Sequence, residues 1–153
     1  MVKYLLLFIV VGSIFFGCKK DAQTTALPTT SVIPAIQLIS ITPTSVHQFT
    51  DSIKFDIQYI DGDGNVGDYS ADSTSLIIID NRNSALVNKF HIPPVTPQGS
   101  SIEVQGEFIA VLKSIILLNS SSSSEATTFS IKLKDRAGNW SNVITTPTVT
   151  ITP

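Results

Sequence analysis

The sequence predicts an all-β fold, an immunoglobulin-like antiparallel β-sandwich of about seven strands. Two segments, 52–60 and 128–134, alternate between apolar and polar residues. A period of two is typical of a strand with one buried and one solvated face. Other short apolar runs are separated by clusters of Gly, Asn, Asp and Ser that indicate turns. The chain shows no internal repeat, which argues against solenoids and propellers.

The expected strands follow one another closely along the chain. They cover residues 35–41, 52–60, 75–80, 85–90, 101–111, 127–134 and 142–151. Within 108–118 the apolar run is also compatible with a helical turn, and the serine run that follows is typical of a flexible loop. In an immunoglobulin-type order, the loops 61–74 and 135–141 lie at the same end of the sandwich.

The first seventeen residues have the pattern of a removable export signal. Lys3 precedes an apolar run from Tyr4 to Phe16, which is shorter than the roughly 20 residues that a membrane-spanning helix needs. The run ends at Gly17, directly before Cys18, the single cysteine of the chain. This arrangement resembles a bacterial lipobox, which implies that Cys18 is lipidated and begins the mature chain. The alternative is a plain signal peptide followed by an incidental cysteine.

The sequence therefore divides into three parts. Residues 1–17 are the predicted lipoprotein signal peptide, 18–34 the lipidated cysteine with a flexible tether, and 35–153 the sandwich domain. The tether is rich in Ser, Thr and Pro, a composition that indicates an extended linker. A lipid anchor at Cys18 places the protein in the cell envelope. We expect the outer membrane, with the choice between its surface and periplasmic faces left open.

Composition argues against several classes of function. Ten basic residues against twelve acidic ones leave no basic excess for binding nucleic acid. One cysteine excludes a disulfide scaffold, and two histidines leave little for histidine-dependent catalysis. The chain contains none of the common hydrolase, zinc-protease or phosphate-loop motifs. We expect no enzyme, and a small hydrolase whose site is assembled from distant residues is the alternative.

The segment 61–68 reads Asp-Gly-Asp-Gly-Asn-Val-Gly-Asp and is rich in oxygen ligands. Calcium takes six to eight oxygens, so this loop is a candidate calcium site, with one further carboxylate from the loop 135–141. The candidate ligands are Asp61, Asp63, Asn65, Asp68 and Asp135. Flanking strands in place of helices exclude an EF-hand. The alternative is a plain turn, because Asp-Gly pairs are strong turn formers.

Trp140 is the only tryptophan and falls in the predicted loop 135–141. A large aromatic side chain gains by burial, so we expect Trp140 to cover the end of the core. The alternative is that its ring stacks on a sugar, which would make the protein a surface glycan-binding lipoprotein.

Three motifs carry a family resemblance: Asp61–Asp68, Ile92–Gly99 and Lys134–Asn142. Together they resemble uncharacterised Bacteroidota lipoproteins with a single immunoglobulin-like domain behind a Cys-Lys-Lys signal. The match spans most of residues 35–150 and implies a fold and a location, but no catalytic residues. We therefore expect a non-enzymatic, lipid-anchored module that binds a protein or glycan or acts as a spacer. Its loops 61–74 and 135–141 are expected to point away from the anchor or toward a partner.

Overall fold

The computed structural model describes residues 31–113 and 115–153. The predicted signal peptide, Cys18 and most of the tether lie outside the described residues, so their assignments stay predictions of the sequence. Across the described ranges, no helix has the length and apolar character needed to cross a membrane.

The described residues form strands and no helix, which confirms the predicted all-β class. In chain order the strands are β1 (Ala35–Thr42), β2 (Ser45–His47), β3 (Ile53–Asp61), β4 (Leu76–Asp80), β5 (Val87–Phe90), β6 (Val104–Leu112), β7 (Glu125–Thr127), β8 (Phe129–Leu133), β9 (Ile144–Thr145) and β10 (Val149–Thr152).

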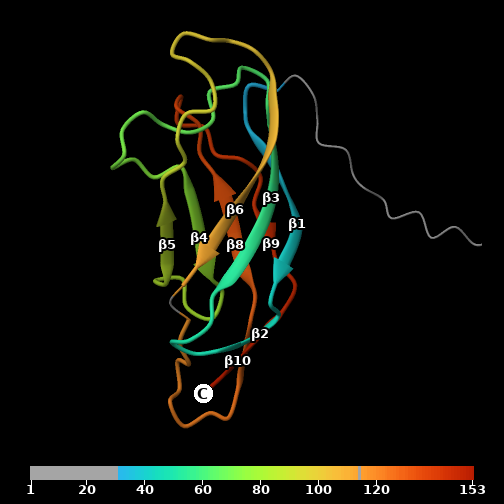
Figure 1. Ribbon diagram of the computed structural model, residues 1–153, viewed down its shortest axis with the longest axis vertical. Coiled ribbons are helices and arrows are strands. Elements are labelled where there is room, and N and C mark those ends of the chain that lie inside the picture. Colours follow the sequence, from blue (N-terminus) through green and yellow to red (C-terminus); the bar gives the residue numbers. More distant parts are fainter. Residues whose placement is uncertain (1–30, 114) are drawn as a thin grey trace, which may run out of the picture.

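Two main sheets form the sandwich, and a small third sheet closes one end (Figure 1). One main sheet has the order β1-β3-β6, and the other has the order β5-β4-β8-β9. All pairs in both main sheets are antiparallel. The third sheet, β2-β10-β7, contains a parallel pair between β2 and β10. The order of the main sheets fits the immunoglobulin-like sandwich that the sequence predicts.

The last predicted strand, 142–151, is divided in two. Its first part, β9, pairs with β8, and its second part, β10, pairs with β7 and β2. Pro147 lies between them and has no N–H group to donate, so a continuous ladder cannot form through it. In the ambiguous segment 108–118, β6 continues to Leu112, and the described residues beyond it, 113 and 115–118, belong to no strand or helix.

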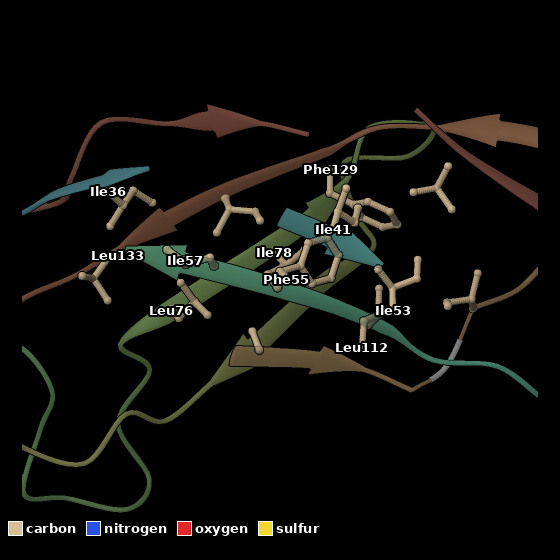
Figure 2. Close-up of a cluster of buried hydrophobic side chains, with 14 of the residues drawn as sticks. Ile36, Ile41, Ile53, Phe55, Ile57, Leu76, Ile78, Leu112, Phe129 and Leu133 are labelled. Carbon is tan, nitrogen blue, oxygen red and sulfur yellow. The ribbon is translucent and has the colours of Figure 1, made fainter. Parts of the chain in front are cut away.

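The core lies between the two main sheets. Phe55 from β3 meets Phe129 from β8 in an edge-to-face contact, with ring centroids 5.3 Å apart. Figure 2 shows Ile57 and Ile78 beside this pair, and all four side chains are fully buried. Each contributes about 2–3 kcal/mol by leaving water. The alternation that predicted β3 and β8 therefore reflects their shared core.

The chain enters the sandwich at the end that carries the predicted functional loops. The carbonyl of Ser31, in the predicted tether, accepts a hydrogen bond of 2.7 Å from the N–H of Gly62. Because β1 is antiparallel to β3, the start of β1 lies beside the end of β3. Figure 1 shows the C-terminus at the opposite end. We expected these loops to point away from the anchor or toward a partner; they lie at the end where Ser31, of the predicted tether, joins the domain.

Candidate cation-binding loop

The loop after β3 is built into the end of the sandwich. Val66 is fully buried in the core and forms a bridge with Asp135, which follows β8. The N–H of Val95 donates to the carbonyl of Val66, and the N–H of Arg136 donates to the carbonyl of Asn65. These contacts bring together the two loops that the predicted strand order placed at one end.

Two glycines let the loop pack this closely. Gly64 and Gly67 have φ angles of 69° and 78°, a region that side-chain-bearing residues rarely adopt. A Cβ atom would collide with the carbonyl oxygen of Ile102 at Gly64 and with that of Pro93 at Gly67. The loop is thus a packed part of the domain and more than a surface Asp-Gly turn.

Three residues of this loop bring their side-chain oxygens together. Asp61 is 1% exposed, and its Oδ2 accepts a hydrogen bond of 2.9 Å from the N–H of Asn65. The amide nitrogen Nδ2 of Asn65 donates to Oδ2 of Asp63 at 2.8 Å. The Oδ1 atoms of Asp61, Asp63 and Asn65 are all buried and have no hydrogen-bond partner. Such orphaned acceptors are rare in folded proteins and unfavourable.

The electrostatics of Asp61 show that negative charge accumulates here. Burial raises the pKa of Asp61 to about 6, and the charges of Asp63 and Asp135 act in the same direction. The hydrogen bond from the N–H of Asn65 opposes this shift without cancelling it. The neighbouring carboxyl group of Asp63 thus contributes to the raised pKa of Asp61, as expected for two carboxyl groups that lie close together.

This set of oxygens suits a hard cation. Two carboxylates and one amide are calcium ligands, and calcium fills its six to eight positions with backbone carbonyls and water. In the part of the chain that the structure describes, no three His, Cys, Asp or Glu side chains form a group that could hold a metal. The candidate site is therefore built on Asp61, Asp63 and the amide of Asn65.

The other two predicted ligands are placed differently. Asp135 is 3% exposed and its charge acts on Asp61, but its two oxygens accept hydrogen bonds from the N–H and Nδ2 of Asn139. Asp68 accepts a hydrogen bond from the N–H of Ser70 and does not contribute to the pKa of Asp61. The structure thus puts Asp135 beside the cluster and directs Asp68 into a turn of its own.

Arg136 has a role in the loop 61–68 that is not apparent from the sequence. Its guanidinium donates to the carbonyls of Val66 and Gly67 and to Oγ1 of Thr96, and it lies 5.2 Å from the ring centroid of Tyr69. The guanidinium therefore holds the second half of the loop 61–68 through the carbonyls of Val66 and Gly67. It forms no salt bridge with a carboxylate among the described residues. No sequence pattern signals these contacts, because the partners are 40 to 70 positions apart.

Trp140 does not cover the end of the core, contrary to expectation. It is 37% exposed and pairs with Lys134 in a short bridge next to β8. The amino groups of Lys132 and Lys134 lie 4.4 and 5.7 Å from the centroid of its ring. The loop is anchored instead by Ser141, whose hydroxyl accepts a hydrogen bond from the N–H of Leu133, so the indole stays on the outer face of the sheet.

The two histidines have separate surroundings. Nδ1 of His47 lies 3.3 Å from Oδ2 of Asp51 at an exposed site. Nδ1 of His91 lies 3.4 Å from Oγ of Ser73. Within residues 31–113 and 115–153, neither histidine has both a carboxylate and a serine hydroxyl as partners. The alternative of a hydrolase with a non-local site thus gains no catalytic triad from the described residues.

No protein-family model, curated protein or solved structure matches this chain. The resemblance to Bacteroidota lipoproteins therefore stays a prediction from three sequence motifs.

Proposed function

We propose that the protein is a lipid-anchored, non-catalytic module of the cell envelope that binds or spaces partners and holds one calcium ion in the loop 61–68. The single observation that carries the calcium site is the trio of buried oxygens without partners on Asp61, Asp63 and Asn65. The anchor is supported by Gly17-Cys18 at the end of the apolar run.

Calcium suits this loop better than the other common cations. The free acceptors are all oxygens, which hard cations prefer, and no sulfur or imidazole ligand is among them. Magnesium demands near-ideal octahedral geometry and keeps its waters. A larger ion with flexible coordination accommodates three oxygens fixed by a short loop more easily. Positive charge also relieves the repulsion among Asp61, Asp63 and Asp135.

The position of the ion has a consequence for the tether. Gly62, between the two acidic ligands, donates its N–H to the carbonyl of Ser31. An ion held by Asp61 and Asp63 stabilises this junction, so calcium fixes the point where the predicted tether leaves the domain. At an extracellular-type affinity of about 10⁻⁴ to 10⁻³ M, a few millimolar calcium stabilises the fold by about 1–2 kcal/mol.

Thermal unfolding of the mature protein, purified from membranes in a neutral detergent, tests the calcium site. Millimolar calcium should raise the melting temperature by several degrees relative to a chelator, with a smaller effect from magnesium. Asp63→Ala should abolish the calcium shift. Asp68→Ala is the matched control and should retain it, because Asp68 lies outside the oxygen cluster. Equal melting temperatures in calcium and chelator would show that the loop 61–68 is a structural turn without a calcium site.

Mass spectrometry of the mature N-terminus tests the anchor separately. The proposal expects a chain that begins at Cys18 and carries acyl groups. An unmodified chain with a different first residue would overturn the anchor and leave the calcium site untouched. Protease treatment of intact cells then decides the face, because a domain on the cell surface is digested and a periplasmic domain survives until lysis.

A further inference from the structure

The outer face of the sheet β5-β4-β8-β9 combines lysines with an exposed indole. Ile77 of β4 lies opposite Lys89 of β5 on one side and opposite Lys132 of β8 on the other. Because side chains alternate between the two faces of a strand, Ile79 and its partner Ser130 lie on the same outer face as Ile77 and Lys132. We call this surface the basic face and define it by Ile77, Ile79, Lys89, Lys132, Lys134 and Trp140.

Positive charge is concentrated on this face of an acidic domain. Residues 31–153 contain eleven acidic and seven basic residues, and three of their five lysines belong to the basic face. The outward positions of its four strands carry no Asp or Glu. Among the described residues, none of these lysines takes part in a salt bridge. The outer face of the opposite sheet, by contrast, carries Asp56 and Glu107 beside Lys54.

Trp140 gives the basic face a second chemical property. Its ring is 37% exposed and lies close to the amino groups of both Lys132 and Lys134. Each cation–π contact is favourable by about 0.5–1 kcal/mol at an exposed site, but the two like charges repel each other. An anion that enters between the lysines relieves that repulsion, and the indole offers an apolar surface beside it.

We propose that the basic face binds an acidic polysaccharide. The flat face of a pyranose ring packs against an aromatic ring, and its carboxylate or sulfate groups pair with ammonium groups. Lys89 and Lys132 stand on strands separated by β4, about 10 Å apart at the usual strand spacing, so one extended polyanion reaches both. The basic face runs from Lys89 of β5 to Trp140, in the loop at the end where the tether joins, and the exposed ring of Trp140 beside two lysines favours a sugar polymer over the bilayer.

Binding of defined polymers to the mature protein in neutral detergent tests this proposal. The probes are polygalacturonate and dextran sulfate, each compared with its uncharged counterpart, methyl-esterified polygalacturonate and dextran. Measurements are made in a chelator, so that their outcome is independent of the calcium site. We expect at least one acidic polymer to bind and to change the fluorescence of Trp140, the single tryptophan. Neither uncharged polymer should do so.

Two double variants with equal charge change provide the control. Lys132→Gln/Lys134→Gln should weaken binding about tenfold, the equivalent of two exposed ion pairs. Lys54→Gln/Lys113→Gln, which removes two exposed lysines outside the basic face, should leave it unchanged. Equal losses in both variants, no response of Trp140, or tighter binding to phosphatidylglycerol vesicles or an acidic protein than to both polymers would overturn the proposal.

Discussion

The two ends of the sandwich both bury carboxylates, but among the described residues only one end pairs them with an arginine. At the end opposite the loop 61–68, Arg82 makes salt bridges of 2.5 Å to both Asp80 and Glu125, and all three side chains are largely buried. Oγ1 of Thr127 also donates to Asp80. At the loop end, Asp61 and Asp63 keep oxygens that have no partner.

The pKa values of the two buried aspartates differ accordingly. Burial alone would raise the pKa of Asp80, but hydrogen bonds from Arg82 and Thr127 outweigh it and lower the pKa. At Asp61 burial and the neighbouring charges raise the pKa to about 6. The contrast teaches that the chain neutralises one acidic cluster with its own arginine and leaves the other with buried oxygens that have no partner, which is the basis of the proposed calcium site.

The largest expected effect comes from removing the internal cation. Arg82→Met leaves Asp80 buried and unpaired, which should lower the free energy of unfolding by about 3–5 kcal/mol. Urea denaturation measures this loss. Arg136→Met, at the loop end, removes hydrogen bonds to carbonyls and a hydroxyl and the contact with the Tyr69 ring, but no salt bridge among the described residues, and should lose about 1–2 kcal/mol. Equal losses would contradict the distinction between the two ends.

A smaller loss of stability is expected from adding a side chain at a glycine of the loop 61–68. Gly64→Ala introduces a Cβ against the carbonyl of Ile102 and a side chain at a positive φ, which together should reduce stability by about 3 kcal/mol. Gly138 also has a positive φ, but a Cβ there meets no atom within 4 Å. Gly138→Ala should therefore lose about 1 kcal/mol. Similar losses for both variants in chemical denaturation would mean that the loop is not packed as described.

Substitution by asparagine should raise the free energy of unfolding at Asp61 and lower it at Asp80. In a chelator, Asp61→Asn removes an unfavourable buried charge and adds a donor beside orphaned oxygens, so it should stabilise the fold by about 1–2 kcal/mol. Asp80→Asn weakens the contacts with Arg82 and should destabilise by about 2 kcal/mol. With calcium present, the advantage of Asp61→Asn should disappear. Destabilisation by both substitutions in the chelator would contradict the account.

The pH dependence of stability tests the same difference between the two aspartates. The folded pKa of Asp61, about 6, exceeds its ordinary value of 3.8, so the folded state binds this proton more tightly. In a chelator the contribution of Asp61 is fully present below pH 3.8 and is lost as the pH rises through 6, by up to about 3 kcal/mol relative to Asp61→Asn. Asp80 acts in the opposite direction, because its lowered pKa makes its contribution fall as the medium becomes acidic. Parallel stability curves for wild type and Asp61→Asn would contradict this prediction.

The sequence predicted well what depends on local periodicity. The alternation in 52–60 and 128–134 located β3 and β8, and the strand order placed the loops 61–74 and 135–141 together. It could not predict contacts between distant side chains. Arg82 meets Glu125 across 43 positions, and Asp68 turns toward Ser70 although its type and spacing fit a ligand set. The face of the sheet on which Trp140 lies depends on the hydrogen bond from the N–H of Leu133 to the hydroxyl of Ser141, which no sequence pattern predicts.

Calorimetric titration of the mature protein with calcium at pH 7 tests the central claim most directly. The account predicts one ion per chain with a dissociation constant of about 10⁻⁴ to 10⁻³ M. Asp63→Asn should remove the binding heat, and Asp68→Asn should leave both stoichiometry and affinity unchanged. No saturable heat in the wild type, or equal loss of binding in both variants, would contradict a calcium site on Asp61, Asp63 and Asn65.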